Sequence, residues 1–158
     1  MNTHNFTIKS QEVIQKAVEI AQAKNQQAVE PAHILKALLS EAENVVSFLF
    51  NKLGVNPTSL SHILDKQIES FPKVSGGEPF LSSSANRAIL EASNYLKEFG
   101  DQFVSAEHIL LGILKSGDTV SQLLKDQGVT EKDLKLAISE LRKGKKVESQ
   151  MAEEQYNA

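Results

Sequence analysis

The stretch VEPAHIL at residues 29–35 returns as VSAEHIL at residues 104–110, and this recurrence decides the fold. The two stretches lie 75 positions apart (104 − 29) and share valine, histidine, isoleucine and leucine at matching places. After a one-residue shift the match resumes 74 positions on, where VS at 46–47 pairs with VS at 120–121. A duplicated unit tolerates one deletion best in a loop. The chain is therefore predicted to contain two copies of one structural unit.

The hydrophobic residues of each copy recur with the spacing of helices rather than strands. Over residues 85–99 the apolar positions follow an i, i+3, i+4, i+7 pattern. Pro31 and Pro57 suit the first turn of a helix, where a missing N–H costs nothing, and Thr7 and Ser82 suit N-cap positions. Period-two alternation is missing. We predict an all-α fold without a sheet, with eight helices in two pseudo-twofold-related four-helix repeats.

Proline and glycine mark the boundaries between the expected units. The segment FPKVSGGEPFL at residues 71–81 holds two prolines and a Gly-Gly pair, which predicts an extended connector. The predicted organisation is one domain over residues 1–144, with the first repeat at 1–70 and the second at 82–144. Residues 145–158 have little apolar content, and we expect them to fray as a linker toward a further module.

Composition excludes several classes of function. The 158 residues are 41% hydrophobic and 23% charged, which is ordinary for one globular domain. Cysteine is absent, so disulfides and thiolate metal sites are excluded. The net charge of −3, with acids and bases mixed, argues against nucleic-acid binding. No stretch approaches the roughly 20 apolar residues that span a bilayer, and we expect no membrane association.

The motifs of catalysis and nucleotide binding are missing. Neither GxxxxGK[ST] nor GxGxxG occurs, and no serine lies in a GxSxG turn. His33 and His108 are the best acid–base or metal candidates, since neutral imidazole serves both roles. We expect instead that each imidazole packs between helices and donates to a backbone carbonyl. We therefore predict no catalytic residue, no metal and no cofactor in this chain.

Residues that break the match between the copies are candidates for function. Asp101 and Glu107 stand where the first copy has glutamine and alanine, and Leu111 stands where it has lysine. Glu107 would also stabilise the first turn of its helix through the macrodipole, by about 0.3–1 kcal/mol. Leu111, Phe48 and Phe50 are extra apolar side chains that either line a partner groove or belong to the core.

Three further stretches resemble one known family. These are NFTIKSQE at residues 5–12, PKVSGGEP at 72–79 and RKGKKV at 142–147. Together with the repeated histidine segments they are similar to the duplicated Clp N-terminal domain, and they favour the ClpB type over the ClpA and ClpC types. The resemblance covers the whole chain and implies the double Clp N-terminal fold.

What the resemblance implies is a substrate-recognition domain of a cytoplasmic stress-response chaperone. Proteins of this type are ATP-driven, homohexameric AAA+ disaggregases that work with the DnaK system on aggregated proteins. The N-terminal domain binds exposed apolar segments of unfolded or aggregated client proteins and passes them to the pore. Client handling in the family is linked to positions that match Thr7, Asp101 and Glu107, although capping alone would also explain Thr7. We add Leu111 as a candidate contact.

The resemblance also implies where the ATPase chemistry lies. ATP and Mg²⁺ would be bound by modules beyond residues 145–158, so the isolated chain is expected to be a monomer without ATPase activity. One alternative is the adaptor-docking domain of a ClpA- or ClpC-type unfoldase of a Clp protease. Another alternative is a stand-alone helical scaffold for protein interactions.

Overall fold

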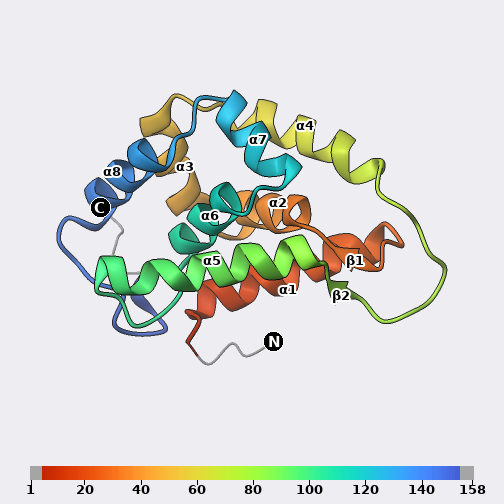
Figure 1. Ribbon diagram of the computed structural model, residues 1–158, viewed down its shortest axis with the longest axis horizontal. Coiled ribbons are helices and arrows are strands. Elements are labelled where there is room, and N and C mark those ends of the chain that lie inside the picture. Colours follow the sequence, from red (N-terminus) through yellow and green to blue (C-terminus); the bar gives the residue numbers. More distant parts are fainter. Residues whose placement is uncertain (1–4, 154–158) are drawn as a thin grey trace.

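The computed structural model describes residues 5–153, and within this range it holds eight α-helices and one very small sheet (Figure 1). The helices are α1 (Ile8–Ala23), α2 (Pro31–Glu41), α3 (Glu43–Leu53), α4 (Pro57–Glu69), α5 (Ser83–Phe99), α6 (Ala106–Lys115), α7 (Thr119–Asp126) and α8 (Glu131–Arg142). The strands are β1 (Ala28–Val29) and β2 (Phe80–Leu81), which pair in parallel. The all-α prediction and its eight helices are confirmed, and the absence of any sheet is wrong.

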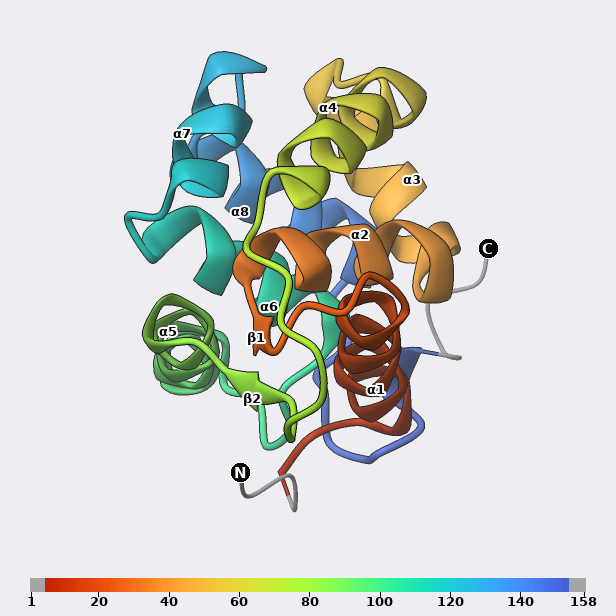
Figure 2. The ribbon, with the colours of Figure 1, turned by 90° about the vertical axis from the view of Figure 1, so that its right-hand side faces the viewer.

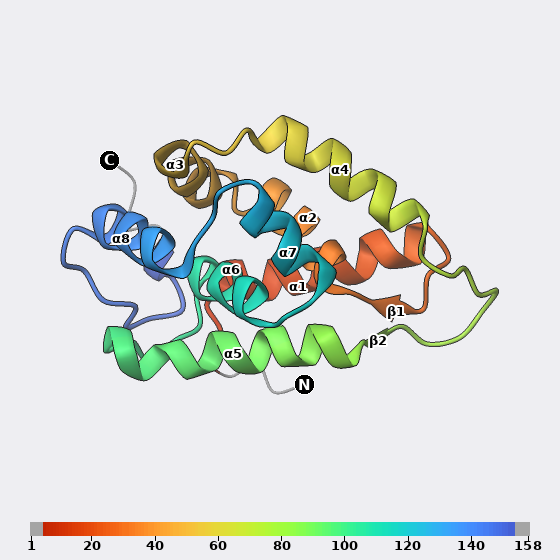
Figure 3. The same ribbon diagram turned by 45° about the horizontal axis from the view of Figure 1, so that its top comes forward.

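The helices are arranged around a central pair. Helices α2 and α6 lie in the middle, with α1 and α5 on one side and α3, α4, α7 and α8 on the other (Figures 1 and 2). Figure 3 brings α4 and α7 forward and shows that they run over the same side of the central pair. Each repeat therefore contributes one helix to the centre, so the two repeats share a single core.

The strand pairing shows how the two copies are related. Val29 pairs with Leu81, and an isolated parallel bridge joins Val104 to Phe6. Adding 75 to residues 6 and 29 gives 81 and 104, so the second pair is the first pair with the copies exchanged. The pairing is thus the same in both directions, as a pseudo-twofold axis requires. Segments of one or two residues are too short to show period-two alternation, which is why the sequence does not predict them.

The N-caps repeat in the same way. Thr7 N–H donates to the carbonyl of Val104, and Ser82 N–H donates to the carbonyl of Val29, both at 3.0 Å. The hydroxyl groups of Thr7 and Ser82 each accept from the backbone amide three residues further on. Both N-cap predictions are confirmed. Each cap also joins the start of a long helix to the other copy.

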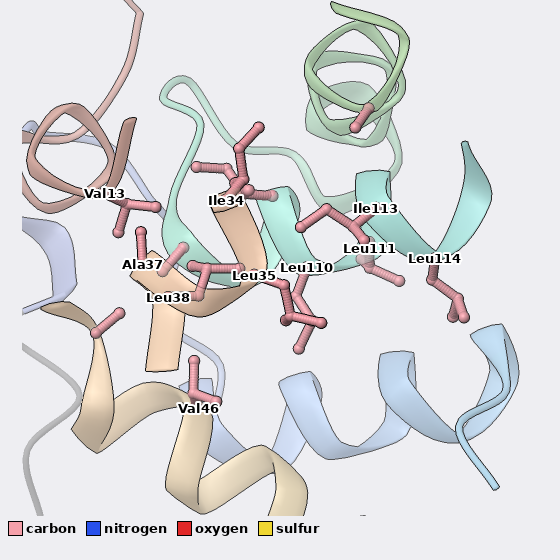
Figure 4. Packing of buried hydrophobic residues seen from close by; sticks show 14 of the residues in the cluster. Val13, Ile34, Leu35, Ala37, Leu38, Val46, Leu110, Leu111, Ile113 and Leu114 are labelled. Atoms are coloured by element: carbon pink, nitrogen blue, oxygen red, sulfur yellow. The ribbon is translucent and has the colours of Figure 1, made fainter. Parts of the chain in front are cut away.

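The core is formed where α2 and α6 meet their neighbours. Leu35, Leu38, Leu110 and Leu111 are all fully buried there (Figure 4). Gly112 allows α6 to approach α5 closely, because a Cβ atom at this position would lie 2.1 Å from the carbonyl oxygen of Ala88. Among residues 5–153, no helix combines the length and the apolar character that crossing a bilayer requires.

Candidate functional site: a buried polar cluster and its strap

The two matched histidines make the same first hydrogen bond. The backbone amide of Glu30 donates to His33 Nδ1 at 2.9 Å, and that of Ser105 donates to His108 Nδ1 at 2.9 Å. Since Nδ1 accepts in both cases, the imidazole hydrogen is on Nε2. The expectation that each histidine donates to a backbone carbonyl is wrong, because Nε2 in each copy meets a side-chain oxygen instead.

In the first copy the histidine lies in a neutral, closed environment. His33 Nε2 donates to Gln26 Oε1 at 2.7 Å, and Gln26 Nε2 donates to the carbonyl of Ile68 at 2.5 Å. The ring of Phe71 lies 5.5 Å from the imidazole, centroid to centroid. Burial lowers the pKa of His33 to about 4, because the charged imidazolium would lose its hydration. This site is therefore neutral near pH 7.

In the second copy charged residues take the same positions. His108 Nε2 donates to Asp101 Oδ2 at 2.7 Å, and Arg142 Nη1 donates to the same oxygen at 2.7 Å. Arg142 Nε also donates to Glu107 Oε2 at 3.0 Å. The guanidinium group lies 5.2 Å from the ring of Phe99 and is only 4% exposed. Arg142 stands 74 positions after residue 68, so it replaces Ile68 of the first copy.

Three hydrogen bonds keep the Asp101 carboxylate ionised in spite of its burial. Burial on its own would raise the pKa of Asp101. The hydrogen bonds from His108, the Val147 amide and Arg142, together with the positive charge of Arg142, outweigh that effect and lower the pKa. The cluster thus holds a charged, fully bonded carboxylate in the protein interior.

The segment that follows α8, residues 143–153, packs back onto this cluster, and we refer to it as the strap (Figure 1, dark blue). The Val147 amide donates to Asp101 Oδ1 at 2.9 Å, and the Gln102 amide donates to the carbonyl of Val147 at 2.8 Å. Near α1, the Ile8 amide donates to the carbonyl of Gln150 at 2.8 Å. Val147 is fully buried. The expectation of fraying from residue 145 is wrong as far as residue 153.

Glu153 attaches the end of the strap to two helix N-termini. Its Oε2 accepts from the Thr7 hydroxyl at 2.8 Å and from the Ala106 amide at 3.0 Å. Its Oε1 and Glu107 Oε1 are buried, and neither finds a hydrogen-bond partner among residues 5–153. Burial, and next the charge of Glu107, raise the pKa of Glu153 to about 7 against the bonds from Thr7 and Ala106. The carboxyl group is therefore partly protonated near neutral pH.

The structure brings three of the four predicted site residues together. Thr7, Asp101 and Glu107 all lie at the cluster or under the strap, and all are buried. Leu111 lies one turn after Glu107 on α6 and belongs to the core, with no exposed surface (Figure 4). The core alternative therefore holds for Leu111. In this conformation none of the four offers a surface that a partner could contact.

Phe50 and Phe48 complete the set of extra apolar side chains. Phe50 is fully buried and Phe48 is partly buried, with Lys52 Nζ 5.6 Å from its ring centroid. The apolar asymmetry between the copies therefore serves mainly packing rather than a surface groove.

Two residues of the cluster, Arg142 and Glu153, were not among the predicted site residues. In the sequence Arg142 begins the basic run RKGKKV at residues 142–147, a pattern typical of a solvated helix end. Arg142 matches Ile68 of the first copy, and this match indicates a core position. A charge buried there needs buried partners of opposite charge. For Glu153 the local sequence gives no such signal, because its partner Thr7 lies 146 positions away.

The described cluster consists of contacts that hold structure together. Its donors bond to its own carboxylates and carbonyls. Within residues 5–153, no three side chains of the metal-ligating kinds gather into a group that could hold an ion. The arrangement can position the strap and the loop at residues 100–105.

A comparison with protein families matches residues 5–127 to the Clp repeat (R) N-terminal domain. Over its full length the chain is 56% identical to the chaperone protein ClpB of Bacteroides thetaiotaomicron and 51% identical to that of Porphyromonas gingivalis. In each case it covers 18% of the relative. The chain thus spans about a fifth of the length of the curated relatives that it matches.

Solved structures show the same fold at lower identity. The Hsp104 N-terminal domain from Candida albicans matches with a TM-score of 0.82 at 21% identity, over 95% of this chain and 99% of that one. The ClpV N-domain in a complex with a VipB peptide matches with a TM-score of 0.71 at 16% identity, over 85% of each chain. At such identities the likeness establishes the fold.

Proposed function

The chain belongs to the Clp repeat N-terminal domain family and has ClpB chaperones as its relatives, and from this premise we propose that it recognises exposed apolar segments of unfolded or aggregated proteins. The observation that carries the proposal is the alignment of the whole chain with two chaperones of this type at 56% and 51% identity. A protein of the same fold was solved with a bound peptide, which supports recognition of polypeptide.

Exposed apolar side chains supply the contact surface. Among the described residues, Phe80, Leu90 and Leu136 are 53%, 61% and 57% exposed. Burying one such side chain contributes about 1.5–3 kcal/mol, whereas association costs an estimated 4–15 kcal/mol in lost freedom of motion. A few contacts of this kind give micromolar affinity or weaker, which suits a domain that must release its client.

The predicted site residues take part indirectly. Thr7, Asp101 and Glu107 are buried, so we assign them to setting the loop at residues 100–105 and the strap beside it. Leu111 acts only through the core. A substitution at any of the four would alter client handling by changing shape or stability rather than by removing a contact.

The curated relatives extend well beyond the part that this chain matches. We propose that the whole protein is a homohexameric, ATP-driven disaggregase that cooperates with the DnaK system in the cytoplasm and receives clients from this domain. ATP and Mg²⁺ would be bound by ATPase modules outside residues 1–158. This chain offers them no glycine-rich loop followed by lysine at a helix start. The isolated domain would be monomeric.

Fluorescence anisotropy with a labelled, unfolded, apolar-rich polypeptide tests the proposal. The variant Phe80→Ser/Leu90→Ser should bind at least three-fold more weakly and melt at the same temperature, because both side chains are exposed. Arg87→Ala, an exposed change on the same helix as Leu90, is the matched control and should bind like the original chain. Equal binding by the serine variant and the original chain would contradict this contact surface.

The main alternative is the docking of a folded adaptor, as proposed for a ClpA- or ClpC-type domain. The same assay separates the two functions when the native, folded form of the labelled polypeptide is added as a competitor. Competition by the folded form, equal to that by the unfolded form, would favour adaptor docking.

A further inference from the structure

The three residues that the family resemblance connects with client handling share one physical role in this structure. The hydroxyl group of Thr7 bonds to Glu153, and the carboxylate of Asp101 bonds to the amide of Val147. Glu107 pairs with Arg142 directly before the strap, and its other oxygen is buried without a partner among the described residues. All three residues therefore act on the strap or at its root, although they come from different elements.

The end of the strap carries an electrostatic conflict. Glu107 Oε1 and Glu153 Oε1 are both buried, and neither has a hydrogen-bond partner in the part of the chain that the structure describes. Arg142 already pairs with two carboxylates, Asp101 and Glu107, so these three side chains carry a net charge of −1 before Glu153 is counted. An ionised Glu153 adds a second uncompensated negative charge in a place with little water. A neutral Glu153 adds none.

We propose that the end of the strap, residues 148–153, is releasable: Glu153 in its protonated form latches it onto the N-termini of α1 and α6, and it opens when this carboxyl group ionises. The proton leaves to solvent, and the carboxylate then gains hydration by moving out of the fold. Opening removes the bonds to Thr7 and Ala106 first. Val147, further from Glu153, keeps its contact with Asp101.

The charged groups around Glu153 favour this direction. On the solvent side, Glu153 lines a shallow cavity with Lys9 of α1, Glu41 of α2 and Glu43 of α3. Lys9 already pairs with Glu12 at 3.2 Å.

On the inner side, Glu107 of α6 raises the pKa of Glu153, in addition to burial. Behind it lie Arg142 of α8, Asp101 and His108, which are bonded to one another. Carboxylates thus outnumber Lys and Arg side chains among the groups named on both sides. The Thr7 hydroxyl and the Ala106 amide act in the opposite direction. Their hydrogen bonds stabilise the carboxylate and lower the pKa of Glu153, but by less than burial and Glu107 raise it.

The latch would control how the chain leaves the domain. With the strap bound, the path of residues 143–153 is set by α1, α6 and the loop at residues 100–105. With it open, the backbone from residue 148 onward is released and the direction of exit varies. The inference concerns the strap alone and holds whether or not the domain binds unfolded clients.

Nuclear magnetic resonance of the isotope-labelled chain between pH 5 and 9 tests the latch. The side-chain carboxyl ¹³C resonance of Glu153 should titrate with a midpoint near 7, the value to which its pKa is raised. Over the same range the ¹⁵N heteronuclear NOE of Gln150 and Met151 should fall from the values of ordered backbone toward those of a mobile tail. Titration near the ordinary glutamate value of 4.5, or a strap equally ordered at pH 5.5 and 8.5, would overturn the proposal.

Two matched substitutions isolate the role of Glu153. Glu153→Gln is neutral at every pH and can still accept from Thr7 and Ala106, so the strap should stay ordered up to pH 9. Glu148→Gln removes an exposed carboxylate from the same strap and should leave the transition unchanged. If Glu153→Gln shows the same loss of order as the original chain, Glu153 is not the latch.

A further pair tests the hydroxyl donor. Thr7→Val removes the bond to Glu153 and should order the strap less at pH 6, where the original strap is latched, whereas Thr7→Ser should restore the original behaviour. A Thr7→Val strap as ordered as the original at pH 6 would contradict the geometry of the latch.

Discussion

The two histidine sites begin alike and end differently. His33 and His108 occupy matching positions and accept the same backbone hydrogen bond at 2.9 Å. Around His33 the partners are an amide and a carbonyl, whereas around His108 they are a carboxylate and a guanidinium group. The difference shows how a duplicated fold diverges. The shared bond to Nδ1 keeps the start of the helix in the same conformation in both copies. The other ring nitrogen, Nε2, meets a neutral amide in the first copy and a charged cluster in the second.

The largest expected effect comes from removing the cation of the second site. Arg142→Met should lower the free energy of unfolding by about 3–5 kcal/mol, because it leaves Asp101 and Glu107 as unpaired buried charges. Urea denaturation at pH 7 measures this. Lys132→Met, an exposed change on the same helix, should stay within about 0.5 kcal/mol of the original chain.

The corresponding change in the first copy sharpens the comparison. Gln26→Leu removes a neutral partner from His33, and it should cost only about 1–3 kcal/mol, the price of unsatisfied hydrogen bonds. If Arg142→Met costs no more than Gln26→Leu, the charged site is not the stronger anchor. The burial of Asp101 and Glu107 also means that replacing both with alanine should lower the melting temperature.

The next effect concerns a position where the copies differ in the core. Leu111 is fully buried, whereas its match in the first copy, Lys36, forms an ion pair with Asp65 at 2.9 Å. Leu111→Ala should cost about 2–5 kcal/mol through lost transfer energy and a cavity. Thermal and urea unfolding measure it. Leu136→Ala, an exposed leucine on α8, is the control and should change stability little. A cost below 1 kcal/mol for Leu111→Ala would argue that α6 packs differently.

The pH dependence of the two sites should have opposite signs. His33 has a folded pKa of about 4 against 6.5 for the free side chain, so the unfolded chain binds more protons between these values. Stability from this group is complete above pH 6.5 and is lost as the pH falls, by about 2 kcal/mol at pH 5. Urea denaturation at pH 7 and pH 5 should show this loss in the original chain, and His33→Gln should reduce it.

Glu153 behaves in the other direction. Its folded pKa of about 7 exceeds the ordinary 4.5, so the stability from docking it is present below pH 4.5 and is lost as the pH rises to 7. Glu153→Gln should therefore lose less stability than the original chain as the pH rises to 7. It should keep the loss of stability that His33 causes as the pH falls to 5. If His33→Gln loses as much stability between pH 7 and pH 5 as the original chain does, the buried neutral histidine is not the cause of that loss.

The smallest effect distinguishes the two N-caps. Ser82→Ala should cost about 1 kcal/mol, as is usual for the loss of a cap. Thr7→Ala should cost more, because the Thr7 hydroxyl group also donates to Glu153 at 2.8 Å. Such a bond contributes a further 0.5–1.5 kcal/mol, or about 1 kcal/mol on average. Equal costs at pH 6, measured by thermal unfolding, would indicate that the strap adds nothing to α1.

Much of the fold follows from local patterns. The offset of 75 and then 74 residues is visible because short stretches recur. The prolines at helix starts and the hydroxyl caps at Thr7 and Ser82 are themselves local features, and local features are enough to specify helices. The parallel pairing of Val29 with Leu81 involves too few residues to leave a pattern. Asp101 and Glu107 stand out in the sequence because they break the match between the copies, but a buried acid and an exposed acid look alike in a sequence.

By itself the sequence determined the duplication, the helical class and the family, because each depends on the order of residue types along the chain. Only the tertiary structure decided that Arg142 reaches Asp101 and Glu107, and that Glu153 meets Thr7 146 positions away. Burial and the partners of a charge depend on which distant segments share the interior. A carboxylate on a solvated helix and one beneath a strap have the same local sequence, and only the surrounding protein makes one inert and gives the other a shifted pKa.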